Sequence, residues 1–178
     1  MPWSTVAEAE IVLLPDAGPL ITLAYADSLD LLFKPGWPVQ LVDMVLHELT
    51  RSATPTSELI ARWAAKVPVL TTRTYQRYRE AVDRGDATAR KANLGELAIQ
   101  EAMNDIAQSN PPRTGVFLFE DHKIASASFL LPDNCRKIST RAWLLFLEQK
   151  GWLNSAAQIE RTALSNGRKF SHLRFPPG

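Results

Sequence analysis

The chain has 178 residues, of which 46% are hydrophobic and 22% are charged, and its formal net charge is +1. These values are typical of a globular protein with a core of its own, and the length predicts a single domain over residues 1–178 with its core at about 11–170. The near-neutral charge excludes a broad electrostatic field that would steer polyanions, so any contact with a nucleic acid has to come from a local patch.

The cysteine content and the apolar runs bear on the compartment of the protein. Cys135 is the only cysteine, which excludes a disulfide within the chain and favours a reducing environment. The N-terminal sequence MPWSTVAEAE has no basic segment leading into an apolar one, so we expect no secretory signal. No apolar run approaches the roughly 20 residues that span a bilayer. We therefore expect a cytoplasmic protein with no membrane partner.

Five short runs predict strands, and several of them are apolar on both faces, as in strands that helices cover on both sides. The runs are IVLL at 11–14, VQLV at 39–42, VPVL at 67–70, GVFLF at 115–119 and RKIS at 136–139. Pro68 predicts an edge position for the third of these strands, because proline cannot donate a hydrogen bond to a neighbouring strand.

Segments with helical periodicity separate these runs. They cover residues 19–27, 43–52, 56–66, 73–84, 94–108, 141–150 and 156–165. Pro19 suits a first helical turn, and Thr56 begins a weak capping box. The segment 141–150 is apolar nearly all round, so we expect it to pack on the core or on a partner. Alternating strands and helices predict an α/β fold with a mostly parallel sheet and right-handed crossovers.

Acidic residues recur at the predicted strand ends and on the helices that follow them. They are Asp16, Asp43, Glu48, Glu96, Glu120 and Asp121. Ligands of open α/β sheets bind beyond the carboxyl ends of the strands, so we expect these acids at one edge. Mg²⁺ prefers oxygen ligands, and a ring of carboxylates without a cation is costly because like charges raise one another's pKa. The pattern therefore points to a metal site.

Each acid also has a structural alternative. Asp16 and Asp43 can cap helices, Glu48 can pair with Arg51 on a solvated face, and Glu96 can stabilise the first turn of its helix. Taken singly, these acids do not distinguish a cap from a ligand. Their shared edge is what favours the ligand interpretation, and Ala17 and Gly18 would then leave room for the metal and a substrate phosphate.

Five segments resemble a known family in their order and spacing. They are LLPDAGPLITLAYADSLDLL, VDMVLHELTR, NLGELAIQEA, GVFLFEDHKIA and KISTRAWLLFLEQKGWL. Together they look like the PIN domains, and among these like the VapC-type toxin ribonucleases and their close relatives. The likeness runs from about residue 11 to residue 170. It implies a three-layer α/β/α fold with a short, mostly parallel central sheet.

The resemblance also implies a function and a set of catalytic residues. The chain would be an endoribonuclease that hydrolyses RNA phosphodiester bonds with Mg²⁺ or Mn²⁺, as the toxin of a toxin–antitoxin pair. Asp16, Glu48, Glu96 and Asp121 would be catalytic, and Asp16, Glu96 and Asp121 would be the main metal ligands. An antitoxin protein would be its partner beside the RNA substrate. Apart from the resemblance, the apolar segment 141–150 would suit the two-fold interface of a homodimer.

Further residues take supporting roles in this interpretation. Glu120 and Asp43 are candidate supporting acids, and Ser139 and Thr140 occupy a small polar position near the site. The sequence departs from the family after Asp121, where an arginine often closes the motif. The positive charge that contacts the RNA would then come from Lys123 or Arg141.

Other function classes fit the sequence less well. HELTR at residues 47–51 lacks the second histidine of a zinc protease, and three histidines with one cysteine do not favour a structural zinc site. A phosphoacceptor receiver domain would carry adjacent acids near its first strand and a lysine at a late strand, and neither is seen. The remaining alternative is a catalytically silent PIN-like module that binds a partner or acts as a scaffold.

Overall fold

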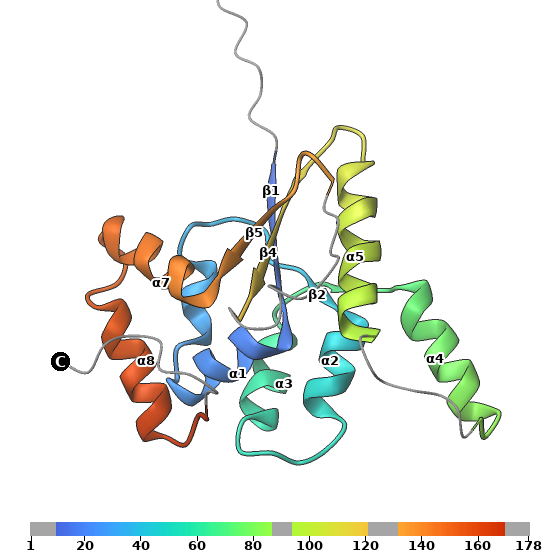
Figure 1. Ribbon diagram of the computed structural model, residues 1–178, viewed down its shortest axis with the longest axis horizontal. Helices are drawn as coiled ribbons and strands as arrows, with labels where there is room; N and C mark the ends of the chain where they lie inside the picture. Colours follow the sequence, from blue (N-terminus) through green and yellow to red (C-terminus); the bar gives the residue numbers. More distant parts are fainter. Residues whose placement is uncertain (1–9, 87–93, 121–131, 170–178) are drawn as a thin grey trace, which may run out of the picture.

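The computed structural model of the chain describes residues 10–86, 94–120 and 132–169, and Figure 1 labels its elements. The strands are β1 (Ile11–Pro15), β2 (Leu41–Val42), β3 (Val69–Leu70), β4 (Thr114–Phe119) and β5 (Arg136–Ser139). The helices are α1 (Ala17–Tyr25), the 3-10 helix η1 (Leu29–Phe33), α2 (Asp43–Thr50), α3 (Ser57–Ala64), α4 (Arg73–Asp83), α5 (Leu94–Ala107), α7 (Thr140–Gln149) and α8 (Ala156–Ser165). The predicted α/β fold is confirmed, and of these elements only η1 was not predicted.

The strands form a parallel sheet in two hydrogen-bonded parts. β4 lies between β1 and β5, and β2 pairs with β3, in each case in parallel. A bridge between Leu13 and Val39 joins the two parts: the Leu13 N–H donates to Pro38 O (2.8 Å), and the Gln40 N–H donates to Leu13 O (3.0 Å). The order across the sheet is therefore β3-β2-β1-β4-β5, with β3 at the edge as Pro68 predicts.

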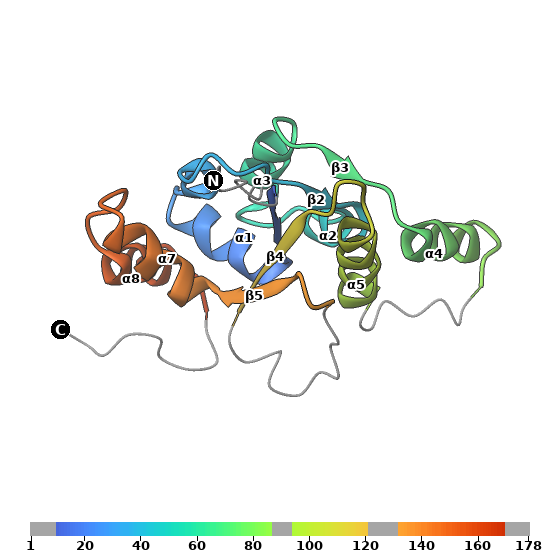
Figure 2. The same ribbon diagram turned by 90° about the horizontal axis from the view of Figure 1, so that it is seen from above.

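Helices cover both faces of this sheet and make three layers. α1, α7 and α8 lie on one side and α5 lies on the other, with α2 beside it (Figures 1 and 2). Val12, Leu13 and Leu14 of β1 are at most 1% exposed, although successive side chains of a strand point to opposite faces. This two-sided burial explains why the strand sequence is continuously apolar.

A glycine in β4 allows α5 to pack closely on the sheet. A Cβ atom on Gly115 would lie 2.8 Å from Met103 Sδ and 3.3 Å from Cys135 Sγ. Both side chains are buried, so a larger residue at position 115 would displace core atoms. The close packing at Gly115 brings α5 against β4, the strand that ends at the acidic edge described below.

The apolar helix α7 packs mainly on the core. Packing on the core was one of the two alternatives predicted for this segment, and packing on a partner was the other. Trp143, Leu144 and Leu147 are at most 1% exposed, whereas Leu145 faces outward and is 42% exposed. Beside them, the rings of Phe146 and Trp143 lie 5.7 Å apart between their centroids. The burial of three large side chains accounts for the apolar character of this helix.

The start of α3 differs from the predicted capping box. Thr56 is the N-cap residue, but within the described residues its side chain makes no capping hydrogen bond. Instead, the Thr54 N–H donates to Ser57 Oγ (3.0 Å) and the Ser57 N–H donates to Thr54 Oγ1 (3.1 Å). Thr56 is 4% exposed, so the reciprocal pair forms on the more exposed residues around it.

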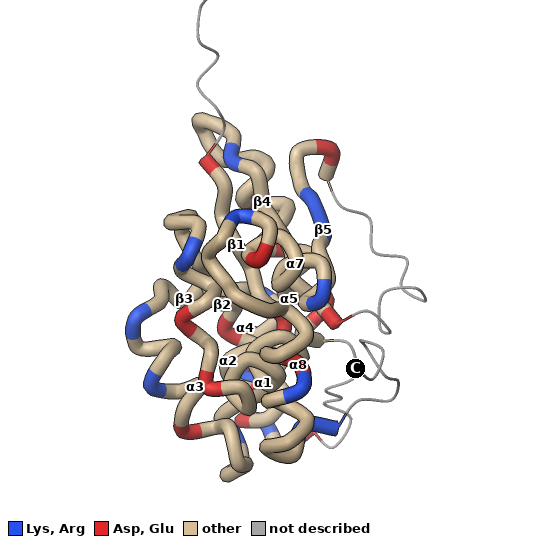
Figure 3. Tube along the Cα trace, turned by 90° about the vertical axis from the view of Figure 1, so that its left-hand side faces the viewer, with Lys and Arg blue, Asp and Glu red and all other residues tan. Residues whose placement is uncertain are grey.

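Charge is spread over the molecule. Acidic and basic positions are interspersed along the trace in Figure 3, in keeping with the net charge of +1. Across the described ranges, no helix has both the length and the apolar character needed to cross a bilayer.

Candidate functional site

Three of the acids directly follow strands at one edge of the sheet. Asp16 comes after β1, Asp43 begins α2 after β2, and Glu120 comes after β4. Because these strands are parallel, their carboxyl ends lie on the same side of the molecule. The remaining described acids of the candidate site, Glu48 and Glu96, lie on α2 and α5.

Asp16 occupies the N-cap position of α1 in an extended conformation, with φ −80° and ψ 174°. Its backbone N–H donates to Leu118 O (2.9 Å), which ties the end of β1 to the end of β4. Within the described part of the chain, its side chain makes no capping hydrogen bond to α1. The capping alternative therefore does not account for this half-buried carboxylate.

Glu48 lies against the start of the helix that carries Glu96. A Cβ atom on Gly95 would lie 3.1 Å from Glu48 Oε2 and 3.2 Å from Glu48 Oε1. Gly95 immediately precedes Glu96 in the first turn of α5, and both acids are half-buried. Because Gly95 has no side chain, the Glu48 carboxylate can lie beside the backbone of this first turn.

Glu120 is buried, with 5% of its surface exposed, and two hydroxyl groups hold its carboxylate. Thr22 Oγ1 on α1 donates to Glu120 Oε1 at 2.8 Å, and Thr140 Oγ1 on α7 donates to the same oxygen at 3.0 Å. A buried carboxylate is costly unless hydrogen bonds compensate for the lost water. Glu120 therefore links the end of β4 to two helices on one face of the sheet.

The Glu120 side chain, and not a metal or a phosphate, occupies the space beside Gly18. A Cβ atom there would lie 2.4 Å from Glu120 Cγ and 3.2 Å from Glu120 Cβ. The prediction that Gly18 leaves room for a metal and a phosphate is therefore wrong, because the Glu120 side chain fills that space.

Asp43 acts as a structural anchor. Its Oδ2 accepts a hydrogen bond from the Thr72 N–H (2.7 Å), and its Oδ1 accepts from Thr72 Oγ1 (2.8 Å) and from the Met44 N–H (2.7 Å). These bonds connect the start of α2 with the start of α4. They favour the structural alternative for Asp43 over a supporting role at a metal.

Ser139 at the end of β5 and Thr140 at the start of α7 have different hydrogen-bond partners. Ser139 Oγ accepts from the Ala142 N–H (3.1 Å) and so caps α7, whereas Thr140 contacts Glu120. Arg141 follows on the same helix and is half-buried. Asp121 and Lys123 lie outside the described residues.

The described carboxylates do not form a metal centre by themselves. Within residues 10–86, 94–120 and 132–169, no group of three or more His, Cys, Asp or Glu side chains is arranged to hold a metal ion. Asp43 and Glu120 have hydrogen-bond donors from the protein on their carboxylates. Asp16, Glu48 and Glu96 carry the oxygen ligands that a hard cation prefers.

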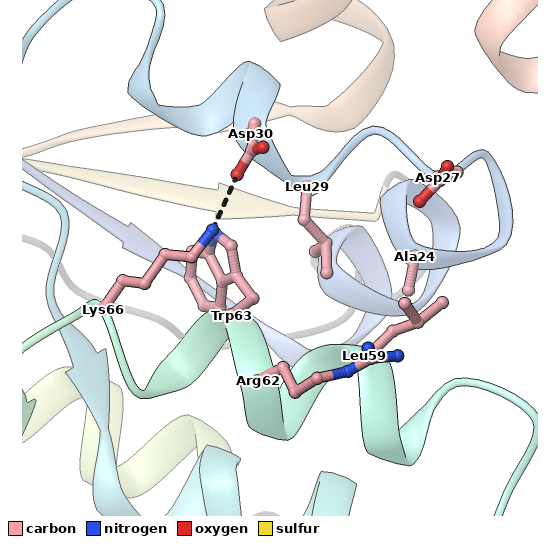
Figure 4. A pocket seen from close by; sticks show the side chains of 8 residues that line it. All are labelled: Ala24, Asp27, Leu29, Asp30, Leu59, Arg62, Trp63 and Lys66. Atoms are coloured by element: carbon pink, nitrogen blue, oxygen red, sulfur yellow. Dashed lines mark ion pairs between the residues drawn. The ribbon is translucent and has the colours of Figure 1, made fainter.

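A pocket lies elsewhere, between α1, η1 and α3 (Figure 4). Its volume is about 310 Å³, and its lining consists of Ala24, Asp27, Leu29, Asp30, Leu59, Arg62, Trp63 and Lys66. Figure 4 shows Lys66 paired with Asp30, at 3.7 Å, while Arg62 and Asp27 lie farther along the pocket. The pocket contains none of the acids at the sheet edge, and opposite charges line it in equal number.

Two residues near Glu120 were not predicted from the sequence. Thr22 is 1% exposed, and a lone hydroxyl inside the apolar run PLITLA is a signal that could have marked it. Arg168 reaches Thr22 from the far end of the chain, and its Nε donates to Thr22 Oγ1 at 3.0 Å. No local pattern connects positions 22 and 168.

Comparison of the chain with protein-family models, with curated proteins and with solved structures finds no match. The likeness to the PIN domains therefore rests on the sequence motifs alone.

Proposed function

We propose that the chain is a Mg²⁺- or Mn²⁺-dependent endoribonuclease that hydrolyses phosphodiester bonds in RNA. The observation that carries the proposal is the arrangement of acids from separate elements at the carboxyl edge of a parallel sheet. Asp16 follows β1 without capping α1, and Glu48 lies against the Gly95–Glu96 turn. Half-buried carboxylates at one edge of a sheet are favoured by a cation, which would offset their mutual repulsion.

Each acid has a defined task in this proposal. Asp16 and Glu96, together with Asp121, would hold the cation, and Glu48 would orient the attacking water. A bound divalent cation would supply Lewis-acid chemistry by stabilising charge on the phosphate and lowering the pKa of water. Lys123 or Arg141 would contact the RNA backbone and fix its register.

The test of this proposal is RNA cleavage by the purified chain. We expect cleavage of mixed-sequence single-stranded RNA or total cellular RNA in Mg²⁺ or Mn²⁺, and its loss on chelation. Asp16→Asn and Glu96→Gln should each lower the rate by about 10³-fold, as the loss of several kcal/mol of stabilisation implies. Circular dichroism should show that both variants remain folded.

Asp30→Asn provides a matched control, because it removes an acidic charge from the distant pocket. Its cleavage rate should stay within about twofold of wild type, since its pair with Lys66 is exposed and weak. Activity that survives chelation, or that is unchanged in Asp16→Asn and Glu96→Gln, would overturn the nuclease proposal.

A second candidate function is a PIN-like binding or scaffold module without turnover. It is favoured by the absence of a complete metal-binding group among the described side chains and by the hydrogen bonds that Glu120 accepts from two threonines. Titration calorimetry with Mn²⁺ separates the two candidates. Binding that Asp16→Asn removes supports the nuclease, and no binding supports the scaffold.

The biological setting extends the same proposal. As the toxin of a toxin–antitoxin pair, the chain would be inhibited by a small partner protein that covers the acidic edge. A homodimer would involve the outward side of α7 and the turn that follows it, where Leu145 and Trp152 are 42% and 40% exposed. Co-purification with the product of the adjacent reading frame, and light scattering of the free chain, test these two partners.

A further inference from the structure

The segment that follows α8 reaches the candidate site from the opposite end of the chain. The Arg168 N–H donates to Ala163 O (2.9 Å), and Gly167 has φ 111°, a left-handed conformation that ends the helix. Asn166 Nδ2 donates to Tyr25 O at 2.7 Å, which fastens this turn to the end of α1. The C-terminal turn of α8 thereby brings Arg168 beside α1.

Arg168, Thr22 and Glu120 form a chain of two hydrogen bonds, in which Arg168 donates to Thr22 and Thr22 donates to Glu120. A threonine hydroxyl has a single hydrogen and two lone pairs. Because Thr22 Oγ1 donates its hydrogen to Glu120 Oε1 (2.8 Å), it can accept from Arg168 Nε (3.0 Å). A cation therefore polarises the hydroxyl that donates to a buried carboxylate, which strengthens that hydrogen bond.

Glu120 needs such support because of where it lies. It is 5% exposed and packs against Gly18 in the first turn of α1, two positions after Asp16. A shift of the Glu120 side chain would push on this turn, because the space beside Gly18 would not hold even a methyl group. The position of Asp16 is thus coupled mechanically to Glu120, and Glu120 is coupled to Arg168 through Thr22.

We propose that Arg168 is a positioning residue of the candidate site, which acts through the Thr22 hydroxyl to hold Glu120 and hence the turn that carries Asp16. This inference rests on the proposed ribonuclease function and adds to it a residue that touches neither substrate nor metal. The segment after α8 is then part of the functional unit.

The test breaks the Arg168–Thr22 hydrogen bond from either side, and Thr22→Val also removes the bond from Thr22 to Glu120. Arg168→Gln and Thr22→Val should each lower kcat for RNA cleavage about tenfold while KM changes less than about twofold, because positioning rather than substrate binding is lost. The double variant should be no slower than Thr22→Val alone, since both changes act through one bond. Thr22→Ser keeps the hydroxyl and should stay within about twofold of wild type.

Arg161→Gln is the matched control. It removes the same charge from the exposed face of α8, where Arg161 donates to Gln158 Oε1 at 3.1 Å. Its kcat should equal that of wild type. All rates are measured at a temperature well below the midpoint of unfolding of each variant, so that loss of folded protein does not imitate loss of kcat.

The outcomes separate the inference from the proposed function. If wild type cleaves RNA and Arg168→Gln retains its kcat, the positioning role is wrong even where the unfolding midpoint falls. Additive losses in Arg168→Gln and Thr22→Val would also contradict it, because they exclude a shared bond. If wild type does not cleave RNA under any metal condition, the ribonuclease proposal fails and the positioning role fails with it.

Discussion

Two glycines at the carboxyl edge of the sheet are packed so closely that adding one methyl group should change the stability of the protein. Gly18 and Gly95 each lie against an acidic side chain from another element, Glu120 and Glu48 respectively. At Gly18 the nearest atom is Cγ in the middle of a buried side chain, whereas at Gly95 the nearest atoms are terminal carboxylate oxygens. A substitution at Gly18 therefore has less room to relax than one at Gly95.

We expect Gly18→Ala to destabilise the protein. Replacing a helical glycine by alanine normally stabilises by about 0.5–1 kcal/mol, but overpacking a buried site costs about 1–3 kcal/mol. The overpacking should dominate here, because Glu120 Cγ lies 2.4 Å from the new methyl position. Urea unfolding of the variant should show a lower free energy of unfolding with an unchanged m-value.

A double-variant cycle provides the control for this substitution. In a Glu120→Ala background the clashing Cγ atom is gone, so Gly18→Ala should cost at least about 1 kcal/mol less than in wild type. An equal cost in both backgrounds would show that Glu120 is not what fills the space at Gly18.

At the scale of elements, the N-terminus of α4 is held by two acids from other helices. Asp43 of α2 accepts from Thr72, the N-cap residue, and Glu101 of α5 accepts from the Arg73 N–H (2.7 Å) and from the Thr74 N–H (3.1 Å) and Oγ1 (3.0 Å). Partial burial disfavours the charged form of Glu101. These hydrogen bonds and the charge of Arg73 outweigh it and hold the pKa of Glu101 below its ordinary value of 4.5.

Glu101→Gln should lower the free energy of unfolding by about 1 kcal/mol, as the loss of a helix cap does. A lowered pKa in the folded state means that the carboxylate stabilises the fold above pH 4.5. The difference between wild type and variant should therefore be constant above pH 4.5 and shrink as the pH falls below it. Chemical denaturation at several pH values measures this difference.

Asp105→Asn makes the same charge change on an exposed position of α5 and controls for the overall charge of the helix. It should leave the free energy of unfolding within about 0.5 kcal/mol of wild type, as for ordinary surface substitutions. A wild-type and Glu101→Gln difference that grew as the pH fell would contradict the role assigned to Glu101.

At the scale of the whole molecule, segments far apart in sequence complete one sheet and one core. β1 pairs with β4 across about a hundred residues, and α8 returns to pack on α1. Cys135 lies within this arrangement, 5% exposed, with its Sγ 3.7 Å from Met103 O. Its environment is therefore created by β4, β5 and α5 together.

The rate at which the Cys135 thiol is modified should measure global unfolding of the protein. Burial raises the pKa of its thiol, so the reactive thiolate is scarce in the native state. We expect iodoacetamide to modify the native chain at least about 100-fold more slowly than the urea-unfolded chain, with the native rate set by global opening. Because Cys135 is the only cysteine, mass spectrometry reads the modification directly. Native and unfolded rates within tenfold of each other would contradict this burial.

The sequence by itself determined the strands, the α-helices and their order, but not the short helix η1. Continuous apolar runs such as IVLL predicted buried strands, and the alternation with helical segments predicted a parallel sheet, because these patterns report local periodicity and burial. The acids after β1, β2 and β4 followed from the same reasoning, since the carboxyl ends of parallel strands share an edge. The functional assignment drew on the family resemblance and stays a prediction.

Only the tertiary structure decided which partner each acidic side chain meets. Asp43 and Glu120 look alike in sequence, yet Asp43 anchors α4 through Thr72, whereas Glu120 is buried between two threonine hydroxyls. The space at Gly18 belongs to Glu120, and Arg168 reaches Thr22 across 146 positions. Hydrogen bonds and close packing depend on distances of a few tenths of an ångström between distant segments, and local sequence patterns carry no such information.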